Sequence, residues 1–454
     1  MNEPTYYPLS SIQNGLAFLF RFYPDLHILN LALRMDFESE INEETMAQAV
    51  REVGKRVTYL RVRLHMQDEE TMVQYLSDEE PAPCEVVDLS DRTEEEIGKI
   101  MFDWTYNAFP NSILDTQLYF FKIVRLPGGR RSLYFCGEHF ILDGYSMLFM
   151  LNYLDRVYAA LDTGSELPEP TPMPWKQVES DLSFYSSERY QRELARALKE
   201  FETEPHFTSI NGLGSPEFIE GQRYGKGLSL TQFDGARINR GIPSELVRRV
   251  DETAKTLNIS SSMYYLLALR SFLGHVSGTE DVTVITSVTA RVTKYEKSCG
   301  LDFATQQFLR SVISGETRFV DALLQLSDTQ NNVLRHSHAH SIDVSRIVHE
   351  RYDVPFGCNY YTTQYSYLPL FDLSRQYLKF MPSYVSNGQS NQPFYMLVLP
   401  ETAKGSLCAT YVYSKEYTDP ANIERFHAFM LKFIEAGLLE PEASVAELIE
   451  KSLD

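Results

Sequence analysis

The sequence contains no long uninterrupted apolar run. None of its hydrophobic segments approaches the roughly 20 residues that a membrane-spanning helix requires. The N-terminus, MNEPTYYPLSSIQ, lacks the basic region followed by an apolar stretch that is typical of a secretory signal. We therefore expect no membrane span and no secretion signal, and we expect a cytoplasmic protein.

Cysteine is scarce and dispersed. The 5 cysteines are Cys84, Cys136, Cys299, Cys358 and Cys408, and no two of them form a CxxC pair. An odd, scattered set argues against a disulfide framework or a zinc site and suits a reducing compartment.

Basic residues are outnumbered. The 42 Lys and Arg face 62 Asp and Glu, for a formal net charge of −20, which disfavours nucleic acid as a partner. The exception is the basic segment 51–63, REVGKRVTYLRVR. It fits a solvated helix followed by a strand, or alternatively a docking patch for an acidic or phosphate-bearing partner.

What is present is an ordinary globular composition, with 43% hydrophobic and 23% charged residues over 454 positions. This length favours two lobes over a single core. Residues 42–57 show helical spacing of apolar residues, 59–66 alternate as a strand does, and 116–126 and 131–140 form two strand-like runs around PGGR. The proline-rich segment 164–175 interrupts this pattern, so we predict mixed α/β (α+β) lobes of residues 1–176 and 177–454.

Residues 136–147, CGEHFILDGYSM, raise the functional question. The pattern places His139 at the end of a strand, and Asp143 is a plausible N-cap for the helix that follows. Connections of this kind often present reactive groups. His139 is therefore either a hydrogen-bonded core histidine or a base at the mouth of a pocket.

The run EHFILDG resembles the His-His-x-x-x-Asp-Gly motif of condensation domains of non-ribosomal peptide synthetases, which have the chloramphenicol acetyltransferase-like fold. Further segments resemble this family in the same order along nearly the whole chain. They are YPLSSIQNGLAFLF, YLRVRL, YSSERYQRELARALKEF, SGTEDVTVITSVTAR, CGLDFATQQFLR and VLRHSHAHSIDVSRI.

The resemblance implies two chloramphenicol acetyltransferase-like lobes in a V shape, with a substrate tunnel at their interface. It implies a free-standing acyltransferase with no bound cofactor. Such an enzyme joins an acyl or aminoacyl thioester, carried on the phosphopantetheine of a carrier protein, to an amine or, as second choice, a hydroxyl acceptor. An acyl-CoA-dependent O- or N-acyltransferase is the enzymatic alternative.

The resemblance also assigns the site residues. His139 is the general base, or at least orients the nucleophile, since a neutral imidazole can take a proton and return it to the leaving thiolate. Asp143 is structural and pairs with Arg291. Gly144 leaves room for a pantetheine arm because it has no Cβ. We expect Ser10, Gln13, Tyr145 and Ser146 to line the tunnel.

Two departures from the family leave alternatives open. Glu138 replaces the first motif histidine and either bonds a loop N–H or carries charge near the substrate. The loop asparagine is replaced by Ala304 or a neighbour. These changes would also suit a non-catalytic module that docks carrier proteins.

A second group of histidines points to a metal only weakly. His336, His338 and His340 alternate, and on a strand they would share one face. No acid or cysteine cluster accompanies them, and the resemblance makes the segment a helix, so we expect no metal.

Overall fold

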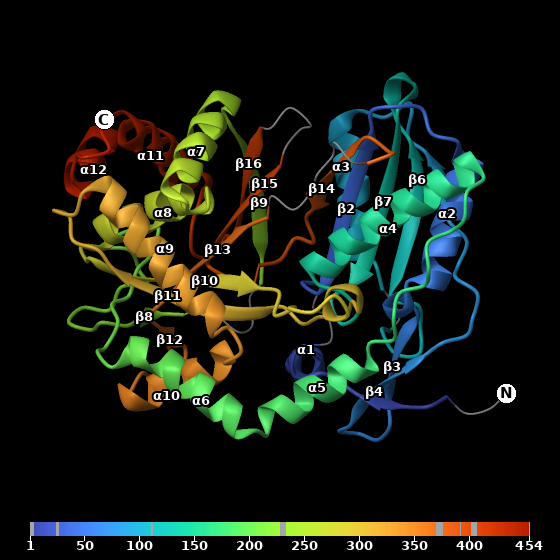
Figure 1. The fold of residues 1–454 in the computed structure, drawn as a ribbon, viewed down its shortest axis with the longest axis horizontal. Coiled ribbons are helices and arrows are strands. Elements are labelled where there is room, and N and C mark those ends of the chain that lie inside the picture. The colour runs from blue at the N-terminus through green and yellow to red at the C-terminus, as the bar shows by residue number, and fades with distance from the viewer. Residues whose placement is uncertain are drawn as a thin grey trace. The chain divides into compact units, whose positions relative to one another are not determined.

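The computed structural model describes residues 4–23, 27–109, 112–227, 233–368, 376–390, 392–400 and 406–453. The chain divides into two compact units, whose elements are labelled in Figure 1. Unit 1 comprises Met1–Ser187, Thr289–Ala304 and Leu370–Gly388. Unit 2 comprises Glu188–Val288, Thr305–Pro369 and Gln389–Asp454.

Unit 1 is built on a five-stranded sheet in the order β14-β2-β7-β6-β5. Its strands are β14 (Phe380–Val385), β2 (Asn30–Phe37), β7 (Arg131–Glu138), β6 (Tyr119–Arg125) and β5 (Glu85–Asp88). All neighbours are antiparallel except β5 and β6, which run parallel. A smaller sheet contains β1 (Tyr7–Pro8), β4 (Met72–Leu76) and β3 (Val62–Met66).

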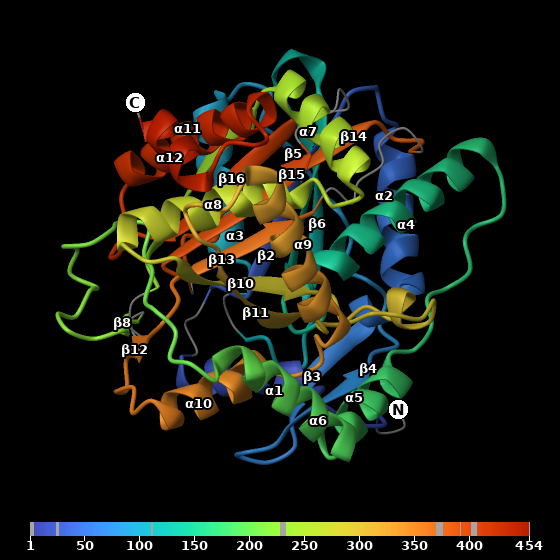
Figure 2. The ribbon, with the colours of Figure 1, turned by 60° about the vertical axis from the view of Figure 1, so that its left-hand side comes forward.

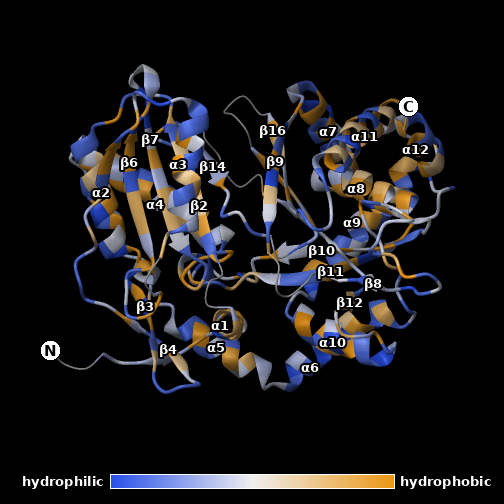
Figure 3. Cartoon of the chain, turned by 180° about the vertical axis from the view of Figure 1, so that it is seen from behind, coloured by the Kyte–Doolittle hydropathy of each residue, from blue (hydrophilic) through white to orange (hydrophobic). Residues whose placement is uncertain are grey.

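Helices cover both faces of the larger sheet. On one face α2 (Glu43–Arg56) packs beside α4 (Gly144–Thr163), and on the other lies α3 (Glu94–Tyr106), as Figure 2 shows. Strand β6 is largely hydrophobic in Figure 3, and side chains of β6 and β7 are buried under helices on both faces of the sheet. Unit 1 also contains α1 (Ser11–Phe22), α5 (Trp175–Tyr185) and the short 3-10 turns η1 (Thr58–Arg61), η2 (Pro127–Gly129) and η4 (Glu296–Ser298).

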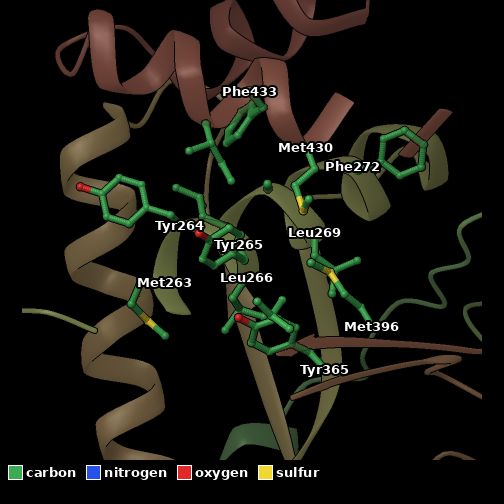
Figure 4. Close-up of a cluster of buried hydrophobic side chains, with 14 of the residues drawn as sticks. Met263, Tyr264, Tyr265, Leu266, Leu269, Phe272, Tyr365, Met396, Met430 and Phe433 are labelled. Atoms are coloured by element: carbon green, nitrogen blue, oxygen red, sulfur yellow. The ribbon is translucent and has the colours of Figure 1, made fainter. Parts of the chain in front are cut away.

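Unit 2 contains a six-stranded mixed sheet in the order β11-β10-β13-β15-β16-β9. Its strands are β11 (Thr305–Val312), β10 (Asp281–Val288), β13 (Thr363–Tyr367), β15 (Phe394–Pro400), β16 (Leu407–Ser414) and β9 (Gly235–Ile242). The core lies under α7 (Ser244–Leu257), α8 (Ser262–Ser277), α9 (Phe319–Arg335), α11 (Pro420–Leu439) and α12 (Val445–Leu453). Figure 4 shows part of it, with Tyr264, Tyr265 and Phe433 among the buried side chains. The other elements are α6 (Glu188–Ala197), η3 (Leu198–Phe201), α10 (Ser341–Arg351), β8 (Gly225–Lys226) and β12 (Cys358–Asn359).

The units differ from the predicted lobes of residues 1–176 and 177–454. The predicted boundary falls inside α5, whereas the units divide after Ser187. The proline-rich segment is fastened to unit 1, since Thr171 donates to the carbonyl of Arg56 and Tyr153 donates to that of Pro168. The predicted V shape and interface tunnel stay predictions.

Two later segments also complete unit 1. Residues 289–304 connect β10 to β11, and residues 370–388 lie between β13 and β15 in the chain. The second segment carries β14, which pairs along the edge of β2. Such pairing between distant segments has no local sequence signal, which explains why a single boundary did not describe it.

The basic segment 51–63 is mostly neutralised by acids. Arg51 and Lys55 both contact Glu80, Arg56 contacts Glu52 and Arg61 contacts Asp78, while Arg63 is buried. These contacts fit the solvated helix and strand, α2 and β3.

The histidine run is a turn and not the predicted helix. Residues 336–340 connect α9 to α10, because α9 ends at Arg335. Among the residues that the structure describes, no group of three or more His, Cys, Asp or Glu could hold a metal ion. All five cysteines are free, and no helix in the described ranges is long and apolar enough to cross a membrane.

Candidate functional site

The EHFILDG segment joins β7 to α4, and this part of the secondary-structure prediction is confirmed. The backbone N–H of Glu138 donates to the carbonyl of Leu118, and that of His139 donates to the carbonyl of Leu29 at 2.8 Å. These bonds hold the strand end between two neighbouring segments. Residues 139–141 then form a turn that leads to Asp143, the N-cap of α4.

Both carboxylate oxygens of Asp143 form structural hydrogen bonds within the protein. Its Oδ1 accepts from the backbone N–H of Ser146 at 2.8 Å and from the Ser146 hydroxyl at 2.9 Å, while the Ser146 hydroxyl accepts from the Asp143 N–H. Its Oδ2 accepts from Arg291 at 2.6 Å and from the N–H of Phe303 at 3.2 Å. Burial would raise the pKa of Asp143, but the Arg291 charge and these hydrogen bonds lower it below its usual value.

Arg291 joins this helix start to the 289–304 segment. Its guanidinium donates to Asp143 and to the carbonyls of Gly300 and Leu301, the latter at 2.8 Å. The cation lies over the rings of Tyr145 and Phe303, at 5.2 and 5.5 Å from their centroids. The structure thus brings together the two residues expected to pair, in a fully buried ion pair.

A left-handed backbone bend follows in the same segment. Gly300 and Leu301 have φ of 67° and 59°. A left-handed φ is costly for leucine, so its surroundings must enforce it. A bridge to Leu142 and the hydrogen bond from Arg291 to the carbonyl of Leu301 do so.

This bend presents Asp302 to His139. Nδ1 of His139 lies 2.9 Å from Oδ2 of Asp302, and the histidine side chain is 28% exposed while that of the aspartate is 3% exposed. The separation suits an ion pair, although Nδ1 is not in hydrogen-bonding geometry. Burial would lower the pKa of His139, but the Asp302 carboxylate outweighs it and raises that pKa to about 9. Burial also raises the pKa of Asp302.

Glu138 points to the opposite face of the sheet from the β7 side chains that pack under α2 and α4. It is 2% exposed, and burial raises its pKa to about 8, although the His139 charge acts in the opposite direction. The carboxyl is therefore mostly neutral at pH 7.

The predicted tunnel residues have different surroundings. Ser10 and Gln13 are buried and form the capping box of α1, and Gln13 also donates to the carbonyl of Phe140 at 2.8 Å. Ser146 caps α4, and Tyr145 stacks on Arg291. Beside Gly144 there is space, because a Cβ there would find its nearest neighbour, the Tyr384 hydroxyl, 3.9 Å away.

Asp302 is the site residue that sequence reasoning missed. The sequence feature that could have identified it is a single acidic residue in the otherwise apolar run GLDFA. This run belongs to the loop in which the family asparagine is replaced. An acid buried among apolar residues usually has a partner. The sequence did not say which.

A separate cavity of about 250 Å³ lies in unit 2, and Arg196, Glu200, Gln307 and His336 are among the residues that line it. His336 contacts the buried carboxylate of Glu193 at 3.2 Å. None of the predicted motif or tunnel residues lines this cavity.

Two curated relatives resemble the chain over 98% and 72% of its length. It is 24% identical over 463 residues to surfactin synthase subunit 1 of Bacillus subtilis (strain 168), with 98% of this chain and 12% of that protein covered. It is 23% identical over 328 residues to gramicidin S synthase 2 of Brevibacillus brevis, with 72% of this chain and 7% of that protein covered. The chain thus spans only a small part of the length of these two relatives.

Solved structures share the fold. The first condensation domain of the calcium-dependent antibiotic synthetase, in complex with a substrate analogue, matches with a TM-score of 0.82 at 17% identity, covering 98% of this chain and 99% of that one. The starter condensation domain of rhizomide synthetase, a mutant in complex with C8-CoA, matches with a TM-score of 0.79 at 17% identity, covering 97% of both chains. The family model described as the condensation domain matches residues 3–451, so this chain belongs to the condensation domain family.

Proposed function

We propose that this chain is a condensation-type acyltransferase that joins a carrier-protein-bound acyl or aminoacyl thioester to an amine acceptor, with a hydroxyl acceptor as second choice. His139 is its general base. The observation that carries this proposal is the position of His139. Its ring is at the end of β7 and partly exposed, while its motif partner Asp143 is occupied by Arg291 and the α4 N-terminus.

The chemistry follows from the two ring nitrogens. Nδ1 lies 2.9 Å from the Asp302 carboxylate, so the aspartate occupies that side of the ring. Nε2 is therefore the atom left to take the acceptor's proton as the new bond to the carbonyl carbon forms. It then returns the proton to the sulfur as the C–S bond breaks, so the histidine ends unchanged. Holding donor and acceptor together would supply much of the acceleration.

The donor arm is the phosphopantetheine of a partner carrier protein. The space beside Gly144 supports entry of a thin arm near the start of α4. Coenzyme A carries the same arm, and a similar starter condensation domain was solved with C8-CoA. An acyl-CoA-dependent acyltransferase is therefore the second candidate function.

The test is product formation. Purified chain is mixed with an acyl-loaded carrier protein, or with acyl-CoA, and a panel of amines and alcohols, and products are detected by mass spectrometry. We expect product with at least one carrier-bound donor and a loss of about 10²- to 10⁴-fold for His139→Ala. Equal turnover by His139→Ala would refute the base assignment. A wild type that binds carrier protein but makes no product with any donor would favour a non-catalytic docking module.

A further inference from the structure

The segment from Gly300 to Ala304 is held rigidly against the start of α4. Arg291 binds its carbonyls at residues 300 and 301, and the N–H of Phe303 donates to Asp143. The ring of Tyr59 fills the space next to Gly300, where a Cβ would lie only 1.9 Å from Tyr59 Cδ1. The segment therefore has little freedom to move.

Within it, the carboxylate of Asp302 has a fixed direction. Oδ1 accepts from the N–H of Ala304 at 3.0 Å, and this bond turns Oδ2 towards Nδ1 of His139, 2.9 Å away. Asp302 is 2% exposed. A buried carboxylate with a single backbone donor needs a counter-charge.

The charged groups around His139 leave one candidate for its counter-ion. Glu138 precedes it on β7, Asp143 lies at the start of α4, and Asp302 comes from the 289–304 segment. Arg291 neutralises Asp143, and Glu138 keeps its proton at neutral pH. Among the described residues, His139 is the only cationic group that forms an ion pair with Asp302.

We infer that Asp302 is the positioning residue of His139. It holds the Nδ1 side of the ring, leaves Nε2 to exchange the proton, and stabilises the imidazolium that forms. This inference rests on the proposed function for its role in turnover, but the pairing itself is independent of activity. Asp302 neither gains nor loses a proton in the cycle, since the proton passes from the acceptor to Nε2 and from Nε2 to the sulfur.

The test titrates His139 directly. Histidine rings are labelled with ¹⁵N, the His139 signals are assigned by their loss in His139→Gln, and the full chain is titrated by NMR. We expect the wild-type ring to titrate near pH 9. Asp302→Asn should lower that pKa towards the ordinary value, an increase of at least tenfold in the proton dissociation constant. Asp302→Glu should keep it closer to wild type.

The control is Asp155→Asn. Asp155 is a buried carboxylate on α4 that accepts from the N–H groups of Tyr377 and Leu378, and its replacement should leave the His139 titration unchanged. A wild-type His139 that titrates at its ordinary pKa would overturn the inference even if Asp302→Asn failed to fold. So would an unchanged His139 pKa in folded Asp302→Asn.

Kinetics separate this inference from the proposed function. With a loaded carrier donor, Asp302→Asn should move the acidic limb of the kcat/KM profile to lower pH and reduce its plateau about a hundredfold. A reduced plateau with an unmoved limb would mean that Asp302 is merely structural. If the wild type turns over no donor, the proposed function fails, and the NMR titration still decides whether Asp302 holds His139.

Discussion

Asp143 and Arg291 lie 2.6 Å apart, although 148 positions separate them in the chain, and both side chains are almost completely buried. Asp143 belongs to the strand-to-helix turn that carries His139, and Arg291 belongs to the segment that carries Asp302. The ion pair therefore holds the turn that carries His139 against the segment that carries Asp302. In this way it sets the position at which the histidine and its carboxylate partner meet.

Breaking this pair should destabilise unit 1. Asp143→Ala leaves Arg291 buried without its counter-charge and removes the cap of α4, which we expect to cost about 3–5 kcal/mol of unfolding free energy. The double variant Asp143→Ala/Arg291→Met should cost less than the sum of the single variants, because no unpaired charge remains. Urea unfolding followed by amide exchange in α4 measures this.

The control for the ion pair is Arg51→Ala, which breaks the exposed contact with Glu80. This variant should leave the midpoint of urea unfolding nearly unchanged. Additive losses in the double variant would contradict the expected coupling of Asp143 and Arg291.

Gly300→Ala should be more damaging than an ordinary glycine replacement. The new Cβ would require a left-handed φ of 67° and would overlap the Tyr59 ring, whose nearest atom lies 1.9 Å from the Cβ position. Gly129 also has a positive φ, of 76°, but nothing lies within 4 Å. We expect Gly129→Ala to cost about 1–2 kcal/mol and Gly300→Ala clearly more, by thermal or urea unfolding. Equal losses would show that Tyr59 moves aside freely.

The local parts of the site could be predicted from sequence, and the long-range parts only in outline. A strand-like run over residues 131–140 and a capping aspartate before an apolar helix identified β7, the turn and α4, because both patterns are local. The partnership of Asp143 with Arg291 came from the family resemblance and not from any pattern in the chain.

Asp302 could not be assigned in the same way. Its direction depends on a left-handed leucine at 301 and on a bridge between Leu142 and Leu301. Leucine carries no preference for that conformation, so no propensity argument would find it. The resemblance was less informative about Ser10 and Gln13. We expected both to line a tunnel, but in the structure their side chains form buried hydrogen bonds within the protein.

The pH dependence of turnover should follow His139. Its pKa is raised to about 9, so the neutral ring that acts as base is scarce at pH 7 and increases as pH rises. With a weakly basic acceptor that stays neutral throughout, kcat/KM should rise about tenfold per pH unit from pH 6 and level off near pH 9. A profile that is flat above pH 7 would contradict the raised pKa.

Gly144→Ala tests the space at the start of α4. The new methyl group would meet nothing closer than 3.9 Å, so the unfolding free energy should be unchanged or rise by up to about 1 kcal/mol. If the donor arm passes here, kcat/KM with a carrier-bound donor should fall by about tenfold or more. Gly15→Ala on α1 is the matched control, since its Cβ also has open space and lies outside the motif. Equal activity of the two variants would place the donor arm elsewhere.

Glu138→Gln should stabilise the protein at high pH. Burial raises the pKa of Glu138 to about 8, so between the unfolded value near 4.5 and pH 8 the folded state holds a proton that the unfolded state releases. Wild-type stability should therefore fall as pH rises through this window, whereas glutamine does not titrate. We expect the two proteins to be similar at pH 4.5 and the variant to be more stable by a few kcal/mol, as an order of magnitude, at pH 8. Urea midpoints measured at half-unit steps give the comparison. A constant difference across the range would mean that Glu138 has an ordinary pKa and that water reaches its carboxylate.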